Sequence, residues 1–338
     1  MIRNGAFAIN PVDWAKQTLG GLMYGHIEYP FVLGNDVAGE VFEVGLDVTR
    51  FKVGERVVGH AVGMDKRSNK SSEGAFQLYT VLRTNLVSPI PIGLSYEEAC
   101  VLPLGVSTAA CGLFQADYLA LNYPTPKPDT RTGETLLVWG ASTSVGSNAV
   151  QLAIAAGYDV IATASPRNHD FVKNLGASEV FDYKSENVVQ DIIKSFKGRN
   201  CAGAIAIGEN SSVSCMKIVS ASKGKKFIAS ASAVNLPTKP PSSLGMLGFV
   251  FSFLSFSVSL WLKSKLKGVD VKFIFGTDLM ANGVSKVIYE DFLPIALTQG
   301  KYVCAPRPLV VGKGLGHVQE AFQIHQKGVS AKKVVVSL

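Results

Sequence analysis

The second half of the chain has a regular pattern, in which apolar runs that predict buried strands alternate with segments of helical periodicity. The strand-like runs are 136–139, 159–164, 179–182, 203–207, 226–231 and 272–276. The helical segments that follow the first three are 147–156, 170–175 and 188–196. Such alternation is typical of a parallel sheet with right-handed crossovers. We therefore predict a doubly wound α/β domain.

The first hundred residues have shorter apolar runs, separated by glycine and proline. These runs lie at 31–33, 37–44, 56–62 and 74–82. Short strands with turn residues between them predict a small, partly open β-barrel. Ser95 and Glu98 then form a capping-box pattern at the start of a helix that continues through 104–113. A helix at 287–298 and a strand at 333–337 are predicted near the end of the chain.

One apolar run does not fit either pattern. It extends from Met246 to Trp261, carries four serines, and is short for a membrane span. We predict a buried strand, a buried helix or an oligomer contact here. A membrane-surface contact and the wall of a substrate channel are the alternatives. No membrane span is expected, and the protein is expected to be a monomer or a homodimer.

Composition indicates the class of protein but not its function. The chain has 338 residues, of which 47% are hydrophobic and 17% charged, as in a well-packed globular protein. Its net charge of +7 comes from scattered basic residues, which suits an anionic cofactor or an acyl thioester better than nucleic acid. Five cysteines without metal-finger spacing, and an N-terminus unlike a signal peptide, predict reduced thiols in the cytoplasm.

The segment 135–157 combines a strand, a turn of small residues and a helix. Small side chains let backbone amides approach a pyrophosphate, and the helix N-terminus adds partial positive charge. Gly140 and Gly146 are present, but Thr143 stands where the pattern has a middle glycine. The flanking strand and helix therefore indicate a dinucleotide site more strongly than the glycines do.

The end of the next strand distinguishes between the two nicotinamide cofactors. An NAD site usually has Asp or Glu there, which binds the ribose hydroxyls. Residues 163–168 contain no carboxylate, and Arg167 can pair with a 2′-phosphate. This pattern favours NADPH over NADH, although Arg167 could also be an ordinary surface arginine.

Two other chemistries find little support. A catalytic zinc site needs a cluster of Cys, His and Glu, and neither His26 nor His60 has a cysteine near it in the chain. We therefore expect no metal site. A Gly-x-Ser-x-Gly nucleophile elbow would need glycine at 144, where this chain has Ser144.

Ordered motifs along almost the whole chain point to a known family. They are NPVDW at 10–14, GNDVAG at 34–39, GERV at 54–57, LPLGVSTA at 102–109, SPRN at 165–168, FDY at 181–183, EDFLP at 290–294 and GVSAKKV at 328–334. On these motifs the chain resembles the zinc-independent branch of the medium-chain dehydrogenase/reductase superfamily, which includes quinone and enoyl reductases. Within that branch it is similar to fungal secondary-metabolite enzymes, including trans-acting enoyl reductases that serve polyketide synthases.

The resemblance implies a domain plan. It comprises a GroES-like catalytic domain at 1–103, a Rossmann NADPH-binding domain at 104–278 and a return to the catalytic domain at 279–338. Zinc-dependent relatives have Gly-His-Glu where this chain has Gly34, Asn35 and Asp36, so one zinc-ligating histidine is missing. Relatives also carry a few tens of residues before the first strand, which implies a truncated gene model or a shortened enzyme with an open barrel edge.

The resemblance also implies a cofactor site. The residues expected to line the pyrophosphate are Gly140, Ser142, Thr143, Ser144, Val145 and Gly146. The residues expected to hold the 2′-phosphate are Ser165, Arg167 and Asn168, with Tyr183 beside them. Tyr183 could instead be an ordinary half-buried aromatic residue. Val329 and Ser330 are expected to close over the cofactor.

On the substrate side, the resemblance implies Thr108 and Lys16 as catalytic residues. The lysine of relatives stands one position earlier, where this chain has Ala15. The implied reaction is hydride transfer from NADPH to the β-carbon of an α,β-unsaturated acyl group, free or carried on a polyketide synthase. Water and Tyr24 are open alternatives for the proton donor. A quinone or carbonyl reductase and a non-catalytic NADPH-binding redox sensor are the alternative functions.

Overall fold

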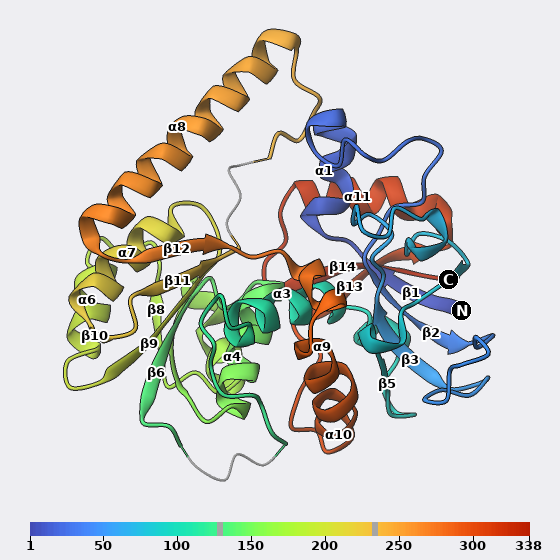
Figure 1. Ribbon diagram of the computed structural model, residues 1–338, viewed down its shortest axis with the longest axis horizontal. Helices are drawn as coiled ribbons and strands as arrows, with labels where there is room; N and C mark the ends of the chain where they lie inside the picture. The colour runs from blue at the N-terminus through green and yellow to red at the C-terminus, as the bar shows by residue number, and fades with distance from the viewer. Residues whose placement is uncertain (127–130, 232–235) are drawn as a thin grey trace. The chain divides into compact units, whose positions relative to one another are not determined.

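The computed structural model describes residues 1–126, 131–231 and 236–338, and these form two units (Figure 1). The first unit comprises Met1–Ser107, Pro237–Pro240 and Thr277–Leu338. The second unit comprises Thr108–Leu236 and Pro241–Gly276.

The second unit is built on a parallel sheet. Along the sheet its strands are β12 (Asp270–Phe273), β11 (Phe227–Ser230), β9 (Asn200–Ala206), β6 (Glu134–Trp139), β7 (Asp159–Ala164) and β8 (Glu179–Asp182). Each neighbouring pair is parallel, and the short β10 (Lys223–Gly224) pairs with β9. Leu136, Leu137 and Val138 of the central strand β6 are fully buried. The predicted doubly wound sheet is confirmed.

Five α-helices accompany this sheet in the described part of the second unit. They are α4 (Ser144–Ala155), α5 (His169–Asn174), α6 (Val188–Ser195), α7 (Ser211–Ala221) and α8 (Ser243–Lys267). A short 3-10 turn, η4 (Pro166–Asn168), precedes α5. Apolar side chains of α6 and α7, such as Ile192 and Val219, form one core cluster with Leu137 of β6 and Ile228 of β11. Burial of these side chains is what holds the two helices on the sheet.

The first unit is built on a mostly antiparallel sheet. Along it the strands are β13 (Arg307–Lys313), β14 (Lys332–Ser337), β1 (Ile2–Ala8), β2 (Asp36–Val41), β3 (Arg56–His60) and β5 (Val87–Pro89). β13 and β14 are parallel, and β4 (Tyr79–Thr80) pairs with β1. Ala6 lies opposite Ser337, so strands from the two ends of the chain are neighbours.

Helices of the first unit are short. They are α1 (Pro11–Leu19), α2 (Tyr96–Ala99), α9 (Val284–Lys286), the π-helix η6 (Val287–Phe292), α10 (Leu293–Thr298) and α11 (Val318–Gln326). Single 3-10 turns are η1 (Gly20–Leu22), η2 (Ser71–Glu73), η3 (Thr84–Leu86), η5 (Gly276–Ala281) and η7 (Leu315–His317). α3 (Pro103–Phe114) crosses from the first unit into the second. The predicted capping box is confirmed, because Glu98 N donates to Ser95 Oγ at 3.2 Å and Ser95 N donates to Glu98 Oε2 at 3.0 Å.

The strand predicted at 74–82 is mostly wrong, since β4 keeps two of its residues. Several backbone carbonyls in this stretch are bound by side chains, although Leu78 O accepts from Asn4 N of β1 at 2.9 Å. Asn4 Nδ2 donates to Ala75 O at 3.1 Å and to Gln77 O at 2.7 Å, and Gln77 Nε2 donates to Gly74 O at 2.7 Å. Gly74 also lies against Val32, whose carbonyl oxygen would be 2.2 Å from an added Cβ.

The apolar run from Met246 to Trp261 forms most of α8, so the predicted buried strand and the predicted burial of a helix within this chain are wrong, while an oligomer contact stays a prediction. Phe251 is 73% exposed and Trp261 is 59% exposed. Figure 1 shows α8 reaching outward from the neighbourhood of α7 and β12. Two helical stretches in the described residues, Tyr96–Phe114 and Ser243–Lys267, are long and apolar enough to cross a membrane. The apolar eighteen-residue stretch of the first is largely buried, whereas no residue in the corresponding stretch of the second is buried.

Candidate functional site

The turn after β6 needs glycine at two positions. Gly140 has φ 85°, and an added Cβ there would lie 2.6 Å from Ile207 O. An added Cβ at Gly146 would lie 2.3 Å from Gly140 O and 2.7 Å from Ala141 Cα. All three distances are shorter than real Cβ contacts, so the turn lies close to Ile207 at Gly140 and to the helix start at Gly146.

Thr143 explains why a middle glycine is not needed. Its backbone has φ −78° and ψ 167°, an extended conformation that any residue adopts. Its Oγ1 accepts a hydrogen bond from Gly146 N at 3.0 Å and donates one to Gly140 O at 2.8 Å. Thr143 is therefore the N-cap of α4, which begins at Ser144, three residues before the predicted start.

The strand order brings the predicted cofactor residues to one edge of the sheet. Gly140 follows the last residue of β6, Ser165 follows β7, and Tyr183 follows β8. These three strands are parallel neighbours. Gly140 N also donates to Thr163 Oγ1 at 3.0 Å, which ties the turn to the end of β7. Carboxyl ends of parallel strands are where doubly wound folds bind ligands.

The residues after β7 and β8 present positive charge at this edge. Arg167 is exposed within η4, and Asn168 is buried with its backbone N–H donating to Ser165 O at 2.8 Å. Tyr183 is 40% exposed, and the ammonium of Lys184 lies 5.9 Å from the centre of its ring. Lys184 was not among the predicted site residues, although its place directly after Tyr183 was a visible signal.

The four remaining predicted residues do not belong to these strand ends. Lys16 is a buried residue of α1, and its Nζ donates to Tyr24 O at 2.8 Å. Thr108 is a buried residue of α3 in the second unit. The neighbours Val329 and Ser330 lie in the first unit between α11 and β14. Their functional roles stay predictions.

The sequence Gly34-Asn35-Asp36 leads into a buried polar cluster of the first unit. The Asp36 carboxylate accepts hydrogen bonds from Asn10 Nδ2 at 2.8 Å and Leu104 N at 2.6 Å, and it pairs with Lys333 Nζ at 2.8 Å. The side chains of Asp36 and Lys333 are 0% and 4% exposed. The Asp36 carboxylate is therefore neutralised within the fold by a lysine far along the chain.

Asp13 belongs to the same cluster but has no such cation of its own. It accepts hydrogen bonds from Asn10 N and from Asn35 Nδ2, each at 2.7 Å. Burial raises the pKa of Asp13 to about 7, and the nearby charge of Asp36 adds to the rise, while the Asn10 hydrogen bond opposes it. Within the described ranges, no three His, Cys, Asp or Glu side chains are grouped so that they could hold a metal ion.

A second buried chain of hydrogen bonds contains His60. His60 Nδ1 lies 3.0 Å from Ser107 Oγ, which lies 2.8 Å from Tyr289 Oη, and that hydroxyl donates to Pro103 O at 3.1 Å. Because Tyr289 donates its proton to Pro103 O, its oxygen accepts the proton of Ser107. The Ser107 oxygen then accepts a hydrogen bond from Nδ1–H of His60. Nε2 of His60 is then an acceptor, and it has no partner among the described residues. Burial lowers the pKa of His60 to about 4, so its ring is neutral near pH 7.

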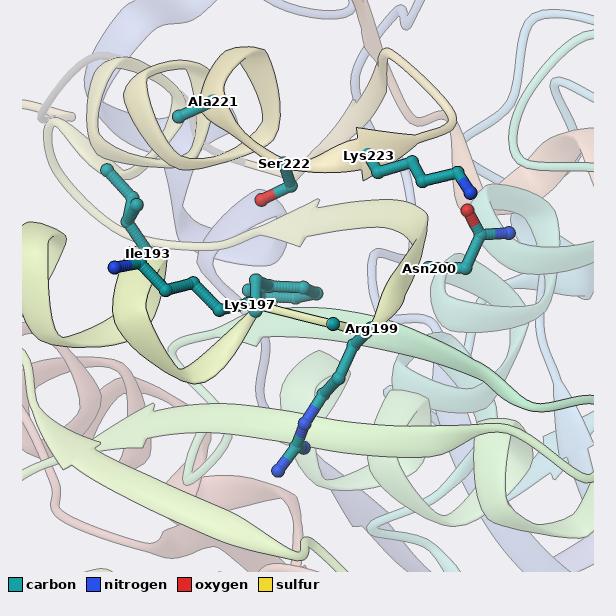
Figure 2. A pocket seen from close by; sticks show the side chains of 9 residues that line it. Ile193, Lys197, Arg199, Asn200, Ala221, Ser222 and Lys223 are labelled. Atoms are coloured by element: carbon teal, nitrogen blue, oxygen red, sulfur yellow. The ribbon is translucent and has the colours of Figure 1, made fainter.

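A hollow of about 380 Å³ in the second unit lies away from the predicted cofactor edge. Figure 2 shows its lining residues, among them Ile193 of α6, Ala221 of α7 and Asn200 of β9. Asn200 is the first residue of β9, whereas Gly140 follows the last residue of the parallel strand β6. The hollow is therefore at the opposite edge of the sheet.

Comparison with known protein families gives two matches. The family described as alcohol dehydrogenase GroES-like domain matches residues 1–92, and the family described as zinc-binding dehydrogenase matches residues 144–246. The first match lies within the first unit, and the second lies on the second unit except for Pro237–Pro240. They agree with a GroES-like domain followed by a Rossmann-type domain.

Similar proteins are known from fungi. The chain is 52% identical over 338 residues to dehydrogenase pigH of Monascus ruber, with 100% of this chain and 91% of that protein covered. It is 36% identical over 334 residues to trans-enoyl reductase himH of Aspergillus japonicus, with 98% and 87% covered. Among solved structures, CurK enoyl reductase has a TM-score of 0.70 at 21% identity, with 99% of this chain and 90% of that chain covered, which shows a shared fold.

Proposed function

This chain belongs to the medium-chain dehydrogenase/reductase superfamily of nicotinamide-dependent oxidoreductases, and we propose that within it the chain is an NADPH-dependent enoyl reductase. The proposed reaction delivers hydride to the β-carbon of an α,β-unsaturated acyl group in fungal polyketide biosynthesis. The reaction class rests on full-length similarity to himH, a trans-enoyl reductase. The choice of NADPH over NADH rests on one observation: Arg167 is exposed in the turn after β7, and residues 163–168 contain no carboxylate.

The turn between β6 and α4 fits a pyrophosphate. Gly146 leaves no Cβ between the turn and the helix start, Gly140 leaves none against Ile207, and the Thr143 cap holds the first turn of α4 in place. Backbone N–H groups at such a helix start favour an anion. We assign Ser142, Ser144 and Val145, on the same turn, to the pyrophosphate. NADPH, when bound, supplies the hydride, and the protein supplies binding and orientation.

The strand ends beside this turn fit a 2′-phosphate. Ser165 and Asn168 flank Arg167 in the loop after β7, and Lys184 adds a second cation after β8. A guanidinium forms paired hydrogen bonds to phosphate oxygens that a ribose hydroxyl cannot match. We therefore assign Ser165, Arg167, Asn168 and Tyr183 to the 2′-phosphate end of the cofactor.

On the substrate side, we assign orienting roles to Thr108 and Lys16. Thr108 carries a hydroxyl that can bond a substrate carbonyl, and Lys16 is a buried cation whose ammonium is already positioned by Tyr24 O. Val329 and Ser330 are proposed to close over the cofactor. An acyl thioester, free or on a carrier of a polyketide synthase, is the proposed substrate, and the cytoplasm is the proposed location.

The cofactor proposal is tested by titrating the purified protein with NADPH and NADH and following cofactor fluorescence. We expect tighter binding of NADPH, and Arg167→Ala should weaken it by about 10-fold to 100-fold, as loss of a charge-assisted pair does, with NADH unaffected. Lys173→Ala, which removes an exposed cation from α5, is the matched control and should change neither affinity. Equal affinities of the unmodified protein for both cofactors would contradict the proposal.

The reaction proposal is tested by NADPH oxidation with a panel of enoyl thioesters, enals, enones and quinones. Steady turnover of an enoyl thioester, with the saturated thioester as product, is expected. Turnover of quinones alone would make the protein a quinone reductase. Tight NADPH binding without oxidation across the panel would instead identify a non-catalytic sensor.

A further inference from the structure

Helix α8 exposes more apolar surface than its place in the fold requires. It connects β11 to β12, two parallel neighbours, and such a crossover helix ordinarily packs on the sheet. Instead Ser264 is its one buried residue, and Leu260 is the one of its side chains that packs against the core cluster. Its large exposed apolar side chains are Leu244, Leu247, Phe251, Phe253, Leu254, Val258, Trp261, Leu262 and Leu266.

The exposed side chains are spread around the helix. Phe253 and Leu262 are nine residues apart, which at about 100° per residue places them on opposite sides, and they are 48% and 49% exposed. A helix that binds a protein groove or a second copy of the chain needs one apolar stripe. A helix that is apolar all round needs an apolar environment on most of its surface, and a lipid bilayer provides one.

The charged side chains within α8 are all of one sign. Between Leu236 and Val269 there is no Asp or Glu, and the last turns of the helix carry Lys263, Lys265 and Lys267. Trp261 stands where the uncharged part of the helix meets these lysines. A tryptophan beside basic residues is typical of the boundary between hydrocarbon and anionic headgroups.

We propose that α8 is a membrane-surface anchor that inserts its apolar side chains into an anionic lipid bilayer. The helix runs parallel to the membrane surface with most of its circumference below the headgroups, and it does not cross the bilayer, because both of its ends connect to adjacent strands of one sheet. Lys263, Lys265 and Lys267 contact the phosphate-bearing headgroups, and Trp261 lies at their level. This interaction is independent of the reaction that the protein catalyses.

Trp261 provides a direct readout of insertion. Trp14 and Trp139 are each 6% exposed, so a change in tryptophan emission on adding vesicles reports Trp261. We expect a blue shift with phosphatidylcholine vesicles that contain about 30% phosphatidylserine, and co-flotation of the full chain with them. Three lysines should make the partition coefficient roughly 100-fold higher than on pure phosphatidylcholine. No shift and no flotation on anionic vesicles would overturn the proposal.

Variants distinguish insertion of α8 from nonspecific binding of the protein to vesicles. The triple variant Leu247→Ser, Phe251→Ser, Leu254→Ser changes only exposed side chains, so it should keep the thermal melting curve but lose flotation. Replacing Lys263, Lys265 and Lys267 with Gln should remove the preference for anionic vesicles. The control Leu46→Ser, Ile92→Ser removes exposed apolar side chains from the first unit and should float like the unmodified chain.

Sedimentation without lipid distinguishes the alternative occupant. The proposal is overturned if three results are found together: the unmodified chain is a stable dimer, the α8 triple variant is a monomer, and neither floats with vesicles. A second copy of the chain would then cover the helix. Flotation that is equal for the unmodified chain and the α8 variant would overturn it as well.

Discussion

The two polar regions of this protein are built in opposite ways. In the turn Gly140–Gly146, Thr143 bonds Gly140, Gly146 and Ser147, all within four residues of it in the chain. In the buried cluster around Asp36, Lys333 bonds Asn10, 323 residues away in the chain. Thr143 is exposed and its bonds are local, whereas the cluster is buried and joins the two ends of the chain. We therefore expect a change of Thr143 to cost less stability than a change in the cluster.

The largest effect is expected at Lys333. Lys333→Met leaves the carboxylate of Asp36 buried without its cation, which should lower the free energy of unfolding by about 3–5 kcal/mol. Chemical denaturation measures this loss. Lys332→Met, one residue earlier and exposed, is the matched control and should change stability by less than about 0.5 kcal/mol. A loss below about 1 kcal/mol for Lys333→Met would mean that Asp36 is not ionised in the folded protein.

The next effect is the pH dependence that His60 contributes. Its folded pKa of about 4 lies below the ordinary value of 6.5, so the unfolded chain binds a proton that the folded chain excludes. Stability should therefore fall as pH drops from about 6.5 to 4, by up to about 3 kcal/mol at 1.36 kcal/mol per unit. Asp13, with its pKa raised to about 7, acts in the opposite sense, lowering stability as pH rises from about 4 to 7.

Because these two trends oppose each other, the His60 contribution is measured as a difference between proteins. Stability of His60→Gln relative to the unmodified chain should improve as pH falls from 6.5 to 4. His317→Gln changes an exposed histidine and is the control. A difference between the unmodified chain and His60→Gln that does not change with pH would show that His60 is not held neutral by burial.

The smallest effect is expected in the local turn. Thr143→Ala removes the N-cap of α4 and should cost about 1 kcal/mol of stability, as loss of an N-cap hydroxyl typically does. Thr143→Ser keeps the hydroxyl and should restore most of that loss. Thermal melting of the three proteins measures both changes. If Ser behaved like Ala, the hydroxyl would not be the capping group.

Local patterns in the sequence predicted much of the second unit. The strands predicted at 159–164 and 179–182 coincide with β7 and β8, and the capping box at Ser95 is present. These features depend on residues close together in the chain, so spacing alone reveals them. The same locality placed Gly140, Ser165 and Tyr183 directly after strands, and the strand order then brought them to one edge.

Many of the strands, turns and caps follow from local sequence, because backbone preferences and side-chain periodicity act over a few residues. Which apolar and charged residues are buried follows from tertiary packing, because burial depends on residues far away in the chain. The apolar run of α8 was predicted to be buried, yet within this chain little covers it. Asp36 and Lys333 are charged, yet they lie in the core, since each supplies the other's counter-charge. Neither outcome can be read from neighbours in the chain.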